Sequence, residues 1–335
     1  MQRLFWIGSP FFSASLSACG WEVRTYNFED IAVFSWQDVV RMAGWEPDVV
    51  VVADKSRPPF VLGMETFPCI TVFYSVDSHI HSWHPLYAQG FDVCLVSLRD
   101  HMDFFGGKAL PAERIWWSPP FARDEDAPVE NGEQPWECLF VGTVDDARTP
   151  KRARFLAELS RHLPGLQVMR GNYRTLFGKG RVLLNHCEAG DLNFRVFEAL
   201  GCGGCLVTPL VGHGLTELFV DGEHLVTYAP GDVRDAATKI RFLLGDPELT
   251  RYIGDTGRKL VDAGHRAQHR AQTFTDKMCD LWIQDAGALV QRRLAHAAAL
   301  REKWLRMPYL LLAETMEIPL LRKAYLAAAG GGFGV

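Results

Sequence analysis

The sequence predicts an α/β protein in which two Rossmann-like domains face each other across a cleft and a helical tail follows. Its 335 residues favour two domains over one. Short apolar runs alternate with helical or loop segments, which is the order of a doubly wound sheet. An acidic segment rich in Pro, Gly and Asn, residues 122–136, interrupts this alternation, which then restarts. The expected division is residues 1–128, residues 129–284 and a tail over 285–335.

The first domain is expected to hold six strands that are buried on both faces. Their sequences are apolar throughout rather than alternating, as in a parallel sheet covered by helices. The predicted strands are residues 3–8, 21–26, 48–54, 69–75, 91–97 and 114–120. The N-terminus also resembles a lipoprotein signal that ends at Cys19, but Gly8, Ser9 and Pro10 break its apolar run. A strand followed by a turn and a helix is therefore the favoured interpretation.

The second domain repeats the alternation. The predicted strands are residues 137–142, 181–187, 205–209 and 224–229. The predicted helices are residues 150–165, 193–201, 232–246 and 247–264. The tail is rich in Ala, Leu and Arg and should be helical. It either packs back on the body or makes a peripheral membrane or homo-oligomer contact.

Composition excludes several classes of protein. The net charge of −5 gives no basic excess for a nucleic acid. No apolar run approaches the roughly 20 residues that span a bilayer. The eight cysteines lie mostly in apolar strand-like runs, and a disulfide framework is unusual at this length. We therefore expect a reducing, cytoplasmic location.

Two charged residues interrupt an apolar segment of the second domain. On a helix that begins near Asn193, Arg195 and Glu198 lie three residues apart and share one face. The helix follows a strand, so its start lies at the carboxyl edge of the sheet, where ligands bind. Arg195 and the N–H groups of the first turn suit a phosphate, and Glu198 can accept from the hydroxyls of a ribose. Spacing alone is more typical of an ion pair on a solvated face.

Glycines follow this helix in two places. Cys202 and Cys205 enclose two of them in a Cys-x-x-Cys that has no partner pair nearby, so we favour packing over a redox or zinc role. After the next strand, Gly212, His213 and Gly214 open a short helix and offer further backbone N–H donors. One such loop is weak evidence, whereas two loops after neighbouring strands favour a nucleotide site.

Residues 193–228 and 235–261 resemble the C-terminal domain of group-1 GT-B glycosyltransferases, most closely the CgeB-like, or spore-maturation-protein-like, branch. The similarity extends more weakly over residues 137–275. The residues that carry the match are Asn193, Arg195, Glu198, Ala199, Gly201, Gly203, Gly204, Gly212, Gly214, Glu217 and Gly222.

The resemblance implies roles in holding a nucleoside-diphosphate sugar. Glu198 would hold the ribose. Arg195 and the amides near Asn193 and Phe194 would meet the diphosphate.

The resemblance also implies roles for residues in two loops. The loop after the first strand of the second domain places Gly142 and a basic residue near the phosphates. The candidates for that basic residue are Arg148, Lys151 and Arg152. Many retaining members carry an acidic residue eight positions before the ribose-binding Glu. That position is Gly190 here, so Glu188 or Asp191 would have to replace it.

A loop after the fourth predicted strand carries the candidate chemistry of the first domain. It places Asp77, His79, His81 and His84 within eight positions. These are plausible zinc ligands, but no second ligand cluster is evident. A neutral imidazole can instead take an acceptor proton or bond a sugar hydroxyl, and the CgeB-like branch has a similar Asp-x-His. We therefore predict Asp77 and His79 as catalytic residues and the other two histidines as structural.

The predicted function is a glycosyltransferase that moves a sugar from UDP- or GDP-sugar to a hydroxyl of a glycan, lipid or protein acceptor. We expect no metal or other cofactor, because a helix N-terminus and basic side chains can neutralise the leaving diphosphate. We also expect retention of the anomeric configuration. Two alternatives stay open: a nucleotide-sugar epimerase of the same fold, and a nucleotide-binding GT-B module without turnover. An NAD-dependent enzyme is disfavoured, since no G-x-G-x-x-G opens either domain.

Overall fold

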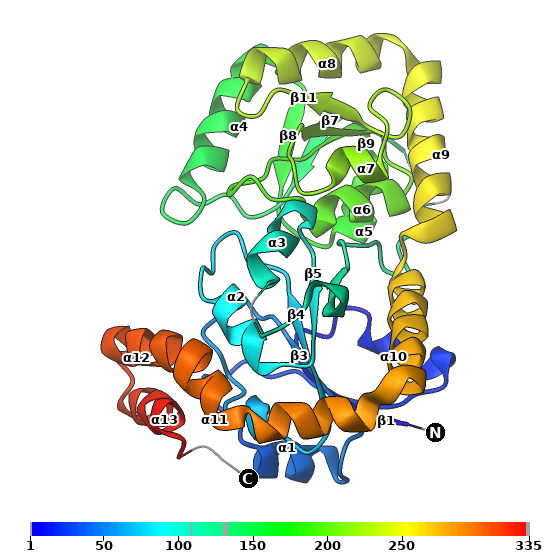
Figure 1. The fold of residues 1–335 in the computed structure, drawn as a ribbon. Coiled ribbons are helices and arrows are strands. Elements are labelled where there is room, and N and C mark those ends of the chain that lie inside the picture. Colours follow the sequence, from blue (N-terminus) through cyan, green and yellow to red (C-terminus); the bar gives the residue numbers. More distant parts are fainter. Residues whose placement is uncertain (1, 108, 130–132, 333–335) are drawn as a thin grey trace. The chain divides into compact units, whose positions relative to one another are not determined.

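The chain divides into two compact units (Figure 1). The computed structural model describes residues 2–107, 109–129 and 133–332. Unit 1 combines Met1–Pro119 with Arg270–Val335, and unit 2 is Pro120–His269. These boundaries differ from the predicted ones at 128 and 284, and the predicted tail is part of unit 1. The N–H of Ala122 donates to the His265 carbonyl at 2.9 Å, which joins the start of the predicted linker to unit 2.

Unit 1 is built on a six-stranded parallel sheet with the order β2-β1-β3-β4-β5-β6. The strands are β1 (Arg3–Gly8), β2 (Glu22–Tyr26), β3 (Val49–Ala53), β4 (Ile70–Ser75), β5 (Val93–Val96) and β6 (Ile115–Trp117). Every residue of β3, β4 and β5 is buried, as expected for strands covered on both faces. All six predicted strands are confirmed. β6 is shorter than predicted because Pro119 and Pro120 have no N–H group to continue the ladder.

The C-terminal helices pack against the core of unit 1. Its helices are α1 (Trp36–Ala43), α2 (His84–Tyr87), α3 (Met102–Phe105), α10 (Ala267–Ala295, which begins within unit 2), α11 (Ala297–Leu300), α12 (Arg306–Thr315) and α13 (Pro319–Gly330). Leu305, Tyr309 and Tyr325 are buried in the same apolar cluster as strand residues of the sheet. The Tyr325 hydroxyl donates to the Pro59 carbonyl at 2.8 Å. Packing on the body is therefore one role of the tail. Among the described residues, no helix is long and apolar enough to cross a membrane.

Unit 2 is built on a five-stranded parallel sheet with the order β11-β10-β9-β7-β8. The strands are β7 (Trp136–Val141), β8 (Leu166–Met169), β9 (Gly180–Leu184), β10 (Leu206–Pro209) and β11 (Val226–Tyr228). The helices are α4 (Pro150–His162), α5 (Tyr173–Leu176), α6 (Phe194–Gly201), α7 (Leu215–Leu218), α8 (Val233–Gly245) and α9 (Pro247–Gly264). The predicted strands and helices are confirmed. Strand β8 was not predicted, because it is a short edge strand whose burial is irregular. Residues 130–132 of the predicted linker lie outside the described residues.

The turn between α6 and β10 explains the glycines of the Cys-x-x-Cys segment. Gly203 has a φ of 76°, in the left-handed region, and a Cβ on Gly204 would lie 2.2 Å from the Leu183 side chain. Both cysteines are unpaired and buried. Burial raises the pKa of each thiol, Cys202 and Cys205, to about 12, so neither is a thiolate at neutral pH. The segment packs and turns the chain, as the sequence analysis favoured.

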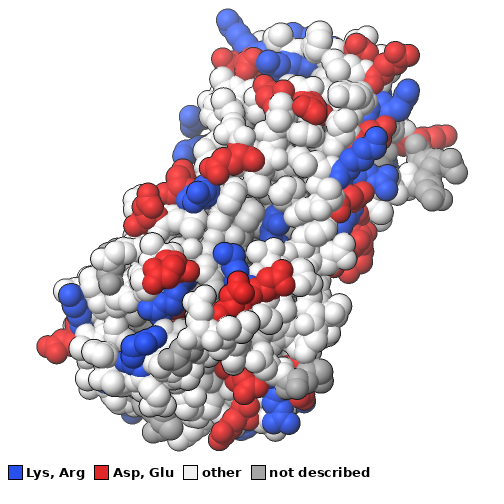
Figure 2. Space-filling view, turned by 45° about the vertical axis from the view of Figure 1, so that its right-hand side comes forward, with Lys and Arg blue, Asp and Glu red and all other residues white. Residues whose placement is uncertain are grey.

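Charged side chains of both signs are interspersed on one face of the molecule (Figure 2). On the face drawn in Figure 2, acidic and basic residues alternate, without a continuous basic field among the described residues. This distribution agrees with the net charge of −5.

One buried arginine attaches α10 to the amino edge of the unit 1 sheet. The Arg293 Nε lies 3.0 Å from both carboxylate oxygens of Asp92, which directly precedes β5. Its two Nη atoms donate to the carbonyls of Met64, Phe67 and Cys69 at 2.6–2.7 Å. The Arg293 and Asp92 side chains are 4% and 1% exposed. Arg293 therefore supplies hydrogen-bond donors both to the backbone carbonyls that precede β4 and to the Asp92 carboxylate that precedes β5.

We predict that Arg293→Ala lowers the free energy of unfolding by about 3–5 kcal/mol, because it leaves the Asp92 carboxylate buried without its partner. Urea denaturation of the full chain measures the loss. Arg292→Ala is the matched control, since this neighbouring residue is exposed, and it should change stability by less than about 0.5 kcal/mol. Equal effects of the two variants would contradict the structural role of Arg293.

Candidate functional site

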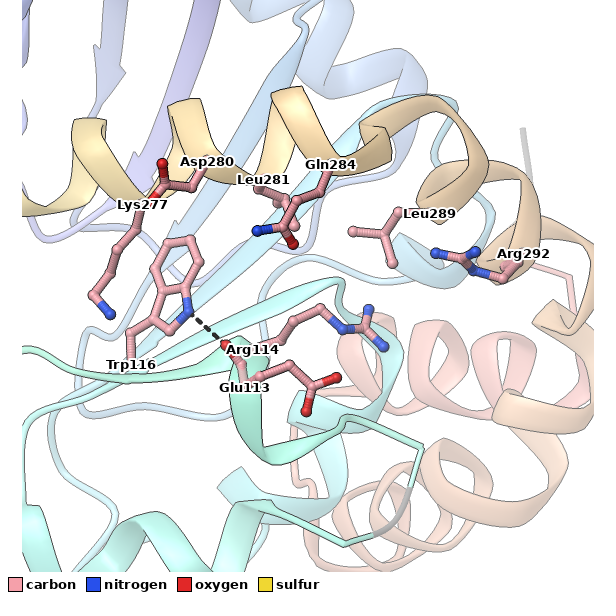
Figure 3. Close-up of a pocket in the computed structure, with 9 residues that line it drawn as sticks. All are labelled: Glu113, Arg114, Trp116, Lys277, Asp280, Leu281, Gln284, Leu289 and Arg292. Carbon is pink, nitrogen blue, oxygen red and sulfur yellow. Dashed lines mark hydrogen bonds between the residues drawn. The ribbon is translucent and has the colours of Figure 1, made fainter.

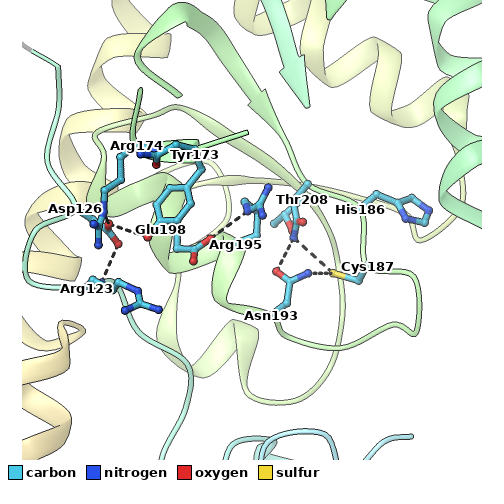
Figure 4. A network of polar contacts seen from close by, with 12 residues as sticks. Arg123, Asp126, Tyr173, Arg174, His186, Cys187, Asn193, Arg195, Glu198 and Thr208 are labelled. Atoms are coloured by element: carbon cyan, nitrogen blue, oxygen red, sulfur yellow. Dashed lines mark hydrogen bonds and ion pairs between the residues drawn. The ribbon is translucent and has the colours of Figure 1, made fainter. Parts of the chain in front are cut away.

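Arg195 and Glu198 form a partly buried pair on the first two turns of α6 (Figure 4). The Arg195 Nε donates to the Glu198 Oε2 at 3.1 Å. The two side chains are 26% and 15% exposed, so this is not an ion pair on a solvated face. Burial raises the pKa of Glu198, although the Arg195 charge opposes this effect. Among the described residues, only Arg195 bonds this carboxylate, which leaves Oε1 for a ligand.

Aromatic rings and a glycine surround the Arg195 guanidinium. Its Cζ lies 6.0 Å from the ring centre of Tyr173 and 5.5 Å from that of Phe177. A Cβ on Gly142, which follows β7, would lie 3.9 Å from the Arg195 Nη1. The structure thus brings Gly142, which was predicted on one segment, beside Arg195 and Glu198, which were predicted together on another. The Gly142 N–H donates to the Met169 carbonyl at 2.9 Å, so this amide is already used within the sheet edge.

A buried carboxylate that the sequence analysis missed fixes Tyr173. Asp126 is fully buried, and its Oδ1 accepts from the Tyr173 hydroxyl at 2.9 Å and from the Arg174 Nε at 2.7 Å. Its Oδ2 accepts from the Arg123 N–H at 2.8 Å. Burial raises the pKa of Tyr173, and so do the nearby Glu198 and Asp126 carboxylates. Because Asp126 lies in the predicted linker and Tyr173 follows the missed strand β8, no sequence signal connected them.

The Asn193 side chain is bound to the ends of the neighbouring strands. Its Oδ1 accepts from the Asn185 Nδ2 at 3.2 Å, and its Nδ2 lies 3.4 Å from the Cys187 Sγ. Asn185 also donates to the Thr208 Oγ1 at 3.1 Å. Asn193 is the N-cap residue of α6 but makes no side-chain cap bond to it. The predicted Phe194 is the first residue of the helix. This network positions the start of α6 against β9 and β10.

Glu188 caps a different helix. Its two oxygens accept from the backbone N–H groups of Lys151 and Arg152, at 3.1 and 2.8 Å, in the first turn of α4. Both oxygens are therefore engaged in holding α4 to the loop after β9. Gly190 has a φ of 81°, where an acidic side chain would be strained. This conformation is a physical reason for the missing acid at that position.

The basic residues predicted beside α4 differ in their surroundings. Arg148 and Lys151 are exposed. The Arg152 Nη1 donates to the Thr143 carbonyl at 2.9 Å, and its guanidinium lies 5.7 Å from the Phe140 ring centre. Arg152 thus holds the loop after β7, whereas the other two side chains extend into solvent.

The glycine loop after β10 has an unusual backbone. His213 has a φ of 65° and Gly214 a φ of 95°. A non-glycine residue in this region is uncommon, and such conformations concentrate at ligand-binding loops. The Leu215 N–H donates to the Gly212 carbonyl at 3.2 Å, which closes the turn before α7.

In unit 1, the loop after β4 is organised by a buried carboxylate that the sequence analysis also missed. Asp54, which follows β3, is 3% exposed and accepts from the N–H groups of Val76 and Asp77 at 3.1 and 2.7 Å. Burial and the Asp54 charge raise the pKa of Asp77. The predicted His79 lies in the same loop and is partly buried.

The two other histidines of this loop bind neighbouring serines. His84 is fully buried, its Nδ1 lies 2.8 Å from the Ser75 Oγ, and burial lowers its pKa. The His81 Nε2 lies 3.3 Å from the Ser56 Oγ. These contacts are consistent with the structural roles expected for both residues.

Comparisons with known proteins identify the fold. Residues 146–276 match a family model described as glycosyl transferase-like. Sucrose-phosphate synthase from Thermosynechococcus elongatus is 12% identical, with a TM-score of 0.59 over 85% of this chain and 100% of that chain. Anabaena HepE in complex with UDP and glucose is 12% identical, with a TM-score of 0.61 over 84% of this chain and 100% of that chain.

A glycosyltransferase from Rickettsia africae is 9% identical, with a TM-score of 0.54 over 82% of this chain and 97% of that chain. No curated protein matches by sequence. The structural likeness confirms the predicted GT-B fold, and the family match supports the resemblance to group-1 enzymes and the prediction of a glycosyltransferase. The narrower likeness to the CgeB-like branch stays a prediction.

We predict that Glu188→Ala lowers the free energy of unfolding by about 1–2 kcal/mol, as for the loss of a helix cap, because two N–H groups of α4 lose their acceptor. Thermal unfolding measures this as a decrease of about 2–8 °C in a unit of this size. The control is Glu158→Ala, an exposed position on the same helix, which should change little. An unchanged midpoint for Glu188→Ala would contradict the capping role.

Proposed function

We propose that this chain transfers a sugar from a nucleoside-diphosphate sugar to an acceptor hydroxyl and that unit 2 holds the donor. The observation that carries the proposal is the partly buried pair of Arg195 and Glu198 at the start of α6, with one carboxylate oxygen available for a ligand. The matched family segment contains both residues. Structures of the similar HepE hold UDP and UDP-glucose, which favours a uridine nucleotide as the first donor to test.

The pair suits the two ends of a nucleoside diphosphate. Arg195 uses its Nε for Glu198, so both of its Nη atoms can donate to phosphate oxygens, the bidentate geometry that guanidinium favours. The Glu198 Oε1 can accept from a ribose hydroxyl. Partial burial strengthens these charge-assisted bonds, because surrounding protein screens them less than water does.

Arg195 and the start of α6 can also stabilise the nucleoside diphosphate as it leaves the sugar. As the sugar–phosphate bond breaks, negative charge develops on the diphosphate, and the Arg195 cation and the positive end of α6 oppose it. On this basis we propose that transfer needs no metal ion or cofactor. Retention of the anomeric configuration is part of the proposal and rests on the resemblance to group-1 enzymes.

For the acceptor, we propose Asp77 and His79 in unit 1. The raised pKa of Asp77 brings its carboxyl group closer to neutral pH, where a group can both take and return a proton. An imidazole beside it can accept the hydroxyl proton or bond a sugar hydroxyl. The expected cytoplasmic location is consistent with eight unpaired cysteines.

The two competing functions differ in their products. A transferase releases nucleoside diphosphate and attaches the sugar to an acceptor. An epimerase changes the sugar while the nucleotide stays attached, and a binding module gives no product. Incubation with UDP-glucose, followed by separation of nucleotides and sugars, distinguishes the three.

We predict that Glu198→Ala abolishes most of the thermal stabilisation by UDP, because the ribose loses its acceptor. For the wild type, UDP at a hundred times its dissociation constant should contribute about 2.7 kcal/mol. A thermal-shift series with UDP and GDP measures both proteins. Glu248→Ala, on the exposed first turn of α9, is the control and should respond as the wild type does. Equal stabilisation of Glu198→Ala and wild type would refute the ribose assignment.

We predict that Arg195→Ala weakens UDP binding about 10- to 100-fold, the loss expected for charge-assisted hydrogen bonds, while uridine binding changes little. Titration calorimetry with uridine, UMP and UDP separates the phosphate contribution from that of the nucleoside. Arg251→Ala, on the exposed face of α9, is the control. Parallel losses for uridine and UDP would show that Arg195 supports the site without meeting the diphosphate.

A further inference from the structure

The helices α12 and α13 present an apolar surface to solvent. One side of α12 packs on the core through Tyr309 and Ala313, and the other side exposes Met307 and Leu311, at 59% and 55%. On α13, Leu320 is 74% exposed. Of the eighteen large hydrophobic side chains exposed in the described part of the chain, six lie between residues 307 and 326. Such a concentration marks an interaction surface rather than scattered exposure.

A cationic pocket adjoins this surface. It has a volume of about 530 Å³. Its lining includes residues of α10 and α11, the π-helical segment Arg301–Leu305 that leads into α12, the segment just before β5, and Arg114, which precedes β6. A neighbouring hollow of about 670 Å³ shares Arg114, Leu289 and Arg292 with it (Figure 3). The larger hollow also contains the carboxylates of Glu113 and Asp280. The smaller pocket contains one carboxylate, Asp92, so it is the better anion site.

Two cations that line the smaller pocket, Arg292 and Lys303, make no ion pair within the described part of the chain. Arg293 and Asp92 satisfy each other. Arg114 donates one bond, to the Asp92 carbonyl at 3.1 Å. Among the described residues, the Arg292 side chain has no hydrogen bond or ion pair. Burial lowers the pKa of Arg114, the Asp92 and Glu113 carboxylates raise it, and the Arg292 charge has a smaller lowering effect. An anion between Arg114 and Arg292 would reduce the repulsion between these two cations.

The apolar surface and the pocket are continuous along the chain. Lys303 and Trp304 line the pocket and lie in the π-helical segment Arg301–Leu305, which continues directly into α12. Cations outnumber carboxylates across this region. The cations are Arg114, Arg292, Lys303, Arg306, Arg322 and Lys323. Apart from Asp92 and Glu65, which pair with Arg293 and Arg301, the carboxylates are Glu113, Glu302, Glu314 and Glu317. This excess stands out in a chain whose net charge is −5.

We propose that α12, α13 and the adjoining 530 Å³ pocket dock on an anionic lipid membrane. The exposed leucines and Met307 enter the boundary of the acyl chains, and a lipid phosphate occupies the pocket between Arg114, Arg292 and Lys303. A second copy of the chain is the less suitable occupant, because a two-fold contact would place the same cationic region against itself. The proposal does not depend on the proposed function.

Vesicle co-sedimentation of the full chain tests the docking surface. We expect sedimentation with vesicles of phosphatidylcholine and phosphatidylglycerol, and little with phosphatidylcholine alone. The double variant R292Q/K303Q should bind about 20- to 30-fold less, the effect of two basic residues at an anionic surface. The double variant L310E/L311E should lose most binding. Both should keep the thermal midpoint and the UDP response of the wild type, because all four positions are exposed.

Matched controls lie in unit 2. Phe242→Glu changes a side chain that is 65% exposed, and R251Q/K259Q removes two exposed cations, so both variants should bind vesicles as the wild type does. Equal binding to neutral and anionic vesicles, no binding, or full binding by the surface variants would each overturn the proposal. It would also be overturned by light scattering that shows a dimer split by L310E/L311E without vesicle binding. Stabilisation by inorganic phosphate without vesicle binding would assign the pocket to a soluble anion instead.

Discussion

Both sheets are parallel, and strands β3, β4 and β5 are buried along their whole length, which limits where polar side chains can lie. A strand covered on both faces can carry charged or hydrogen-bonding side chains only at its ends, because a buried polar group without a partner is costly. In unit 1, the buried Asp54 directly follows β3 and the buried Asp92 directly precedes β5. In unit 2, the buried Asn185 directly follows β9. The carboxyl edges hold the candidate site residues, whereas the amino edge of unit 1 holds the anchor made by Arg293 and Asp92.

The secondary structure could be predicted because buried parallel strands are distinctive in sequence. Runs such as residues 48–54 are apolar at every position, and glycine or proline marks the helix ends. Strand β8 gave no such signal, since it is a four-residue edge strand in which only Leu166 is buried. The units divide at 269, inside a continuous helical segment, where composition does not change. Long-range packing, rather than local sequence, fixes that boundary.

The candidate site could be predicted where its residues share one helix and not where they meet through the fold. Arg195 and Glu198 are three positions apart, so their common face follows from helical geometry. Asp126 and Tyr173 meet across 47 positions, and Asp54 reaches the backbone of the loop after β4. Contacts of this kind depend on which strands are neighbours. The capping role of Glu188 could not be predicted for the same reason. Glu188 follows β9 and bonds the start of α4, which follows β7, and local sequence does not show that these two strands are neighbours.

The structural ion pair of Arg293 and Asp92 differs from the candidate ligand-binding pair of Arg195 and Glu198 in how many of its donor and acceptor atoms are already hydrogen-bonded. Arg293 makes five hydrogen bonds, both oxygens of Asp92 are used, and water reaches almost none of either side chain. Within the described part of the chain, the Arg195 side chain makes one hydrogen bond, to Glu198, and its guanidinium lies beside two aromatic rings. The Arg195 and Glu198 side chains remain 26% and 15% exposed. A fully bonded pair has no capacity for a ligand, so its burial is explained by packing alone. In a partly buried pair, donor and acceptor atoms that lose contact with water and gain no protein partner destabilise the folded state. A ligand that carries a phosphate and neighbouring hydroxyls would hydrogen-bond these atoms and offset that cost.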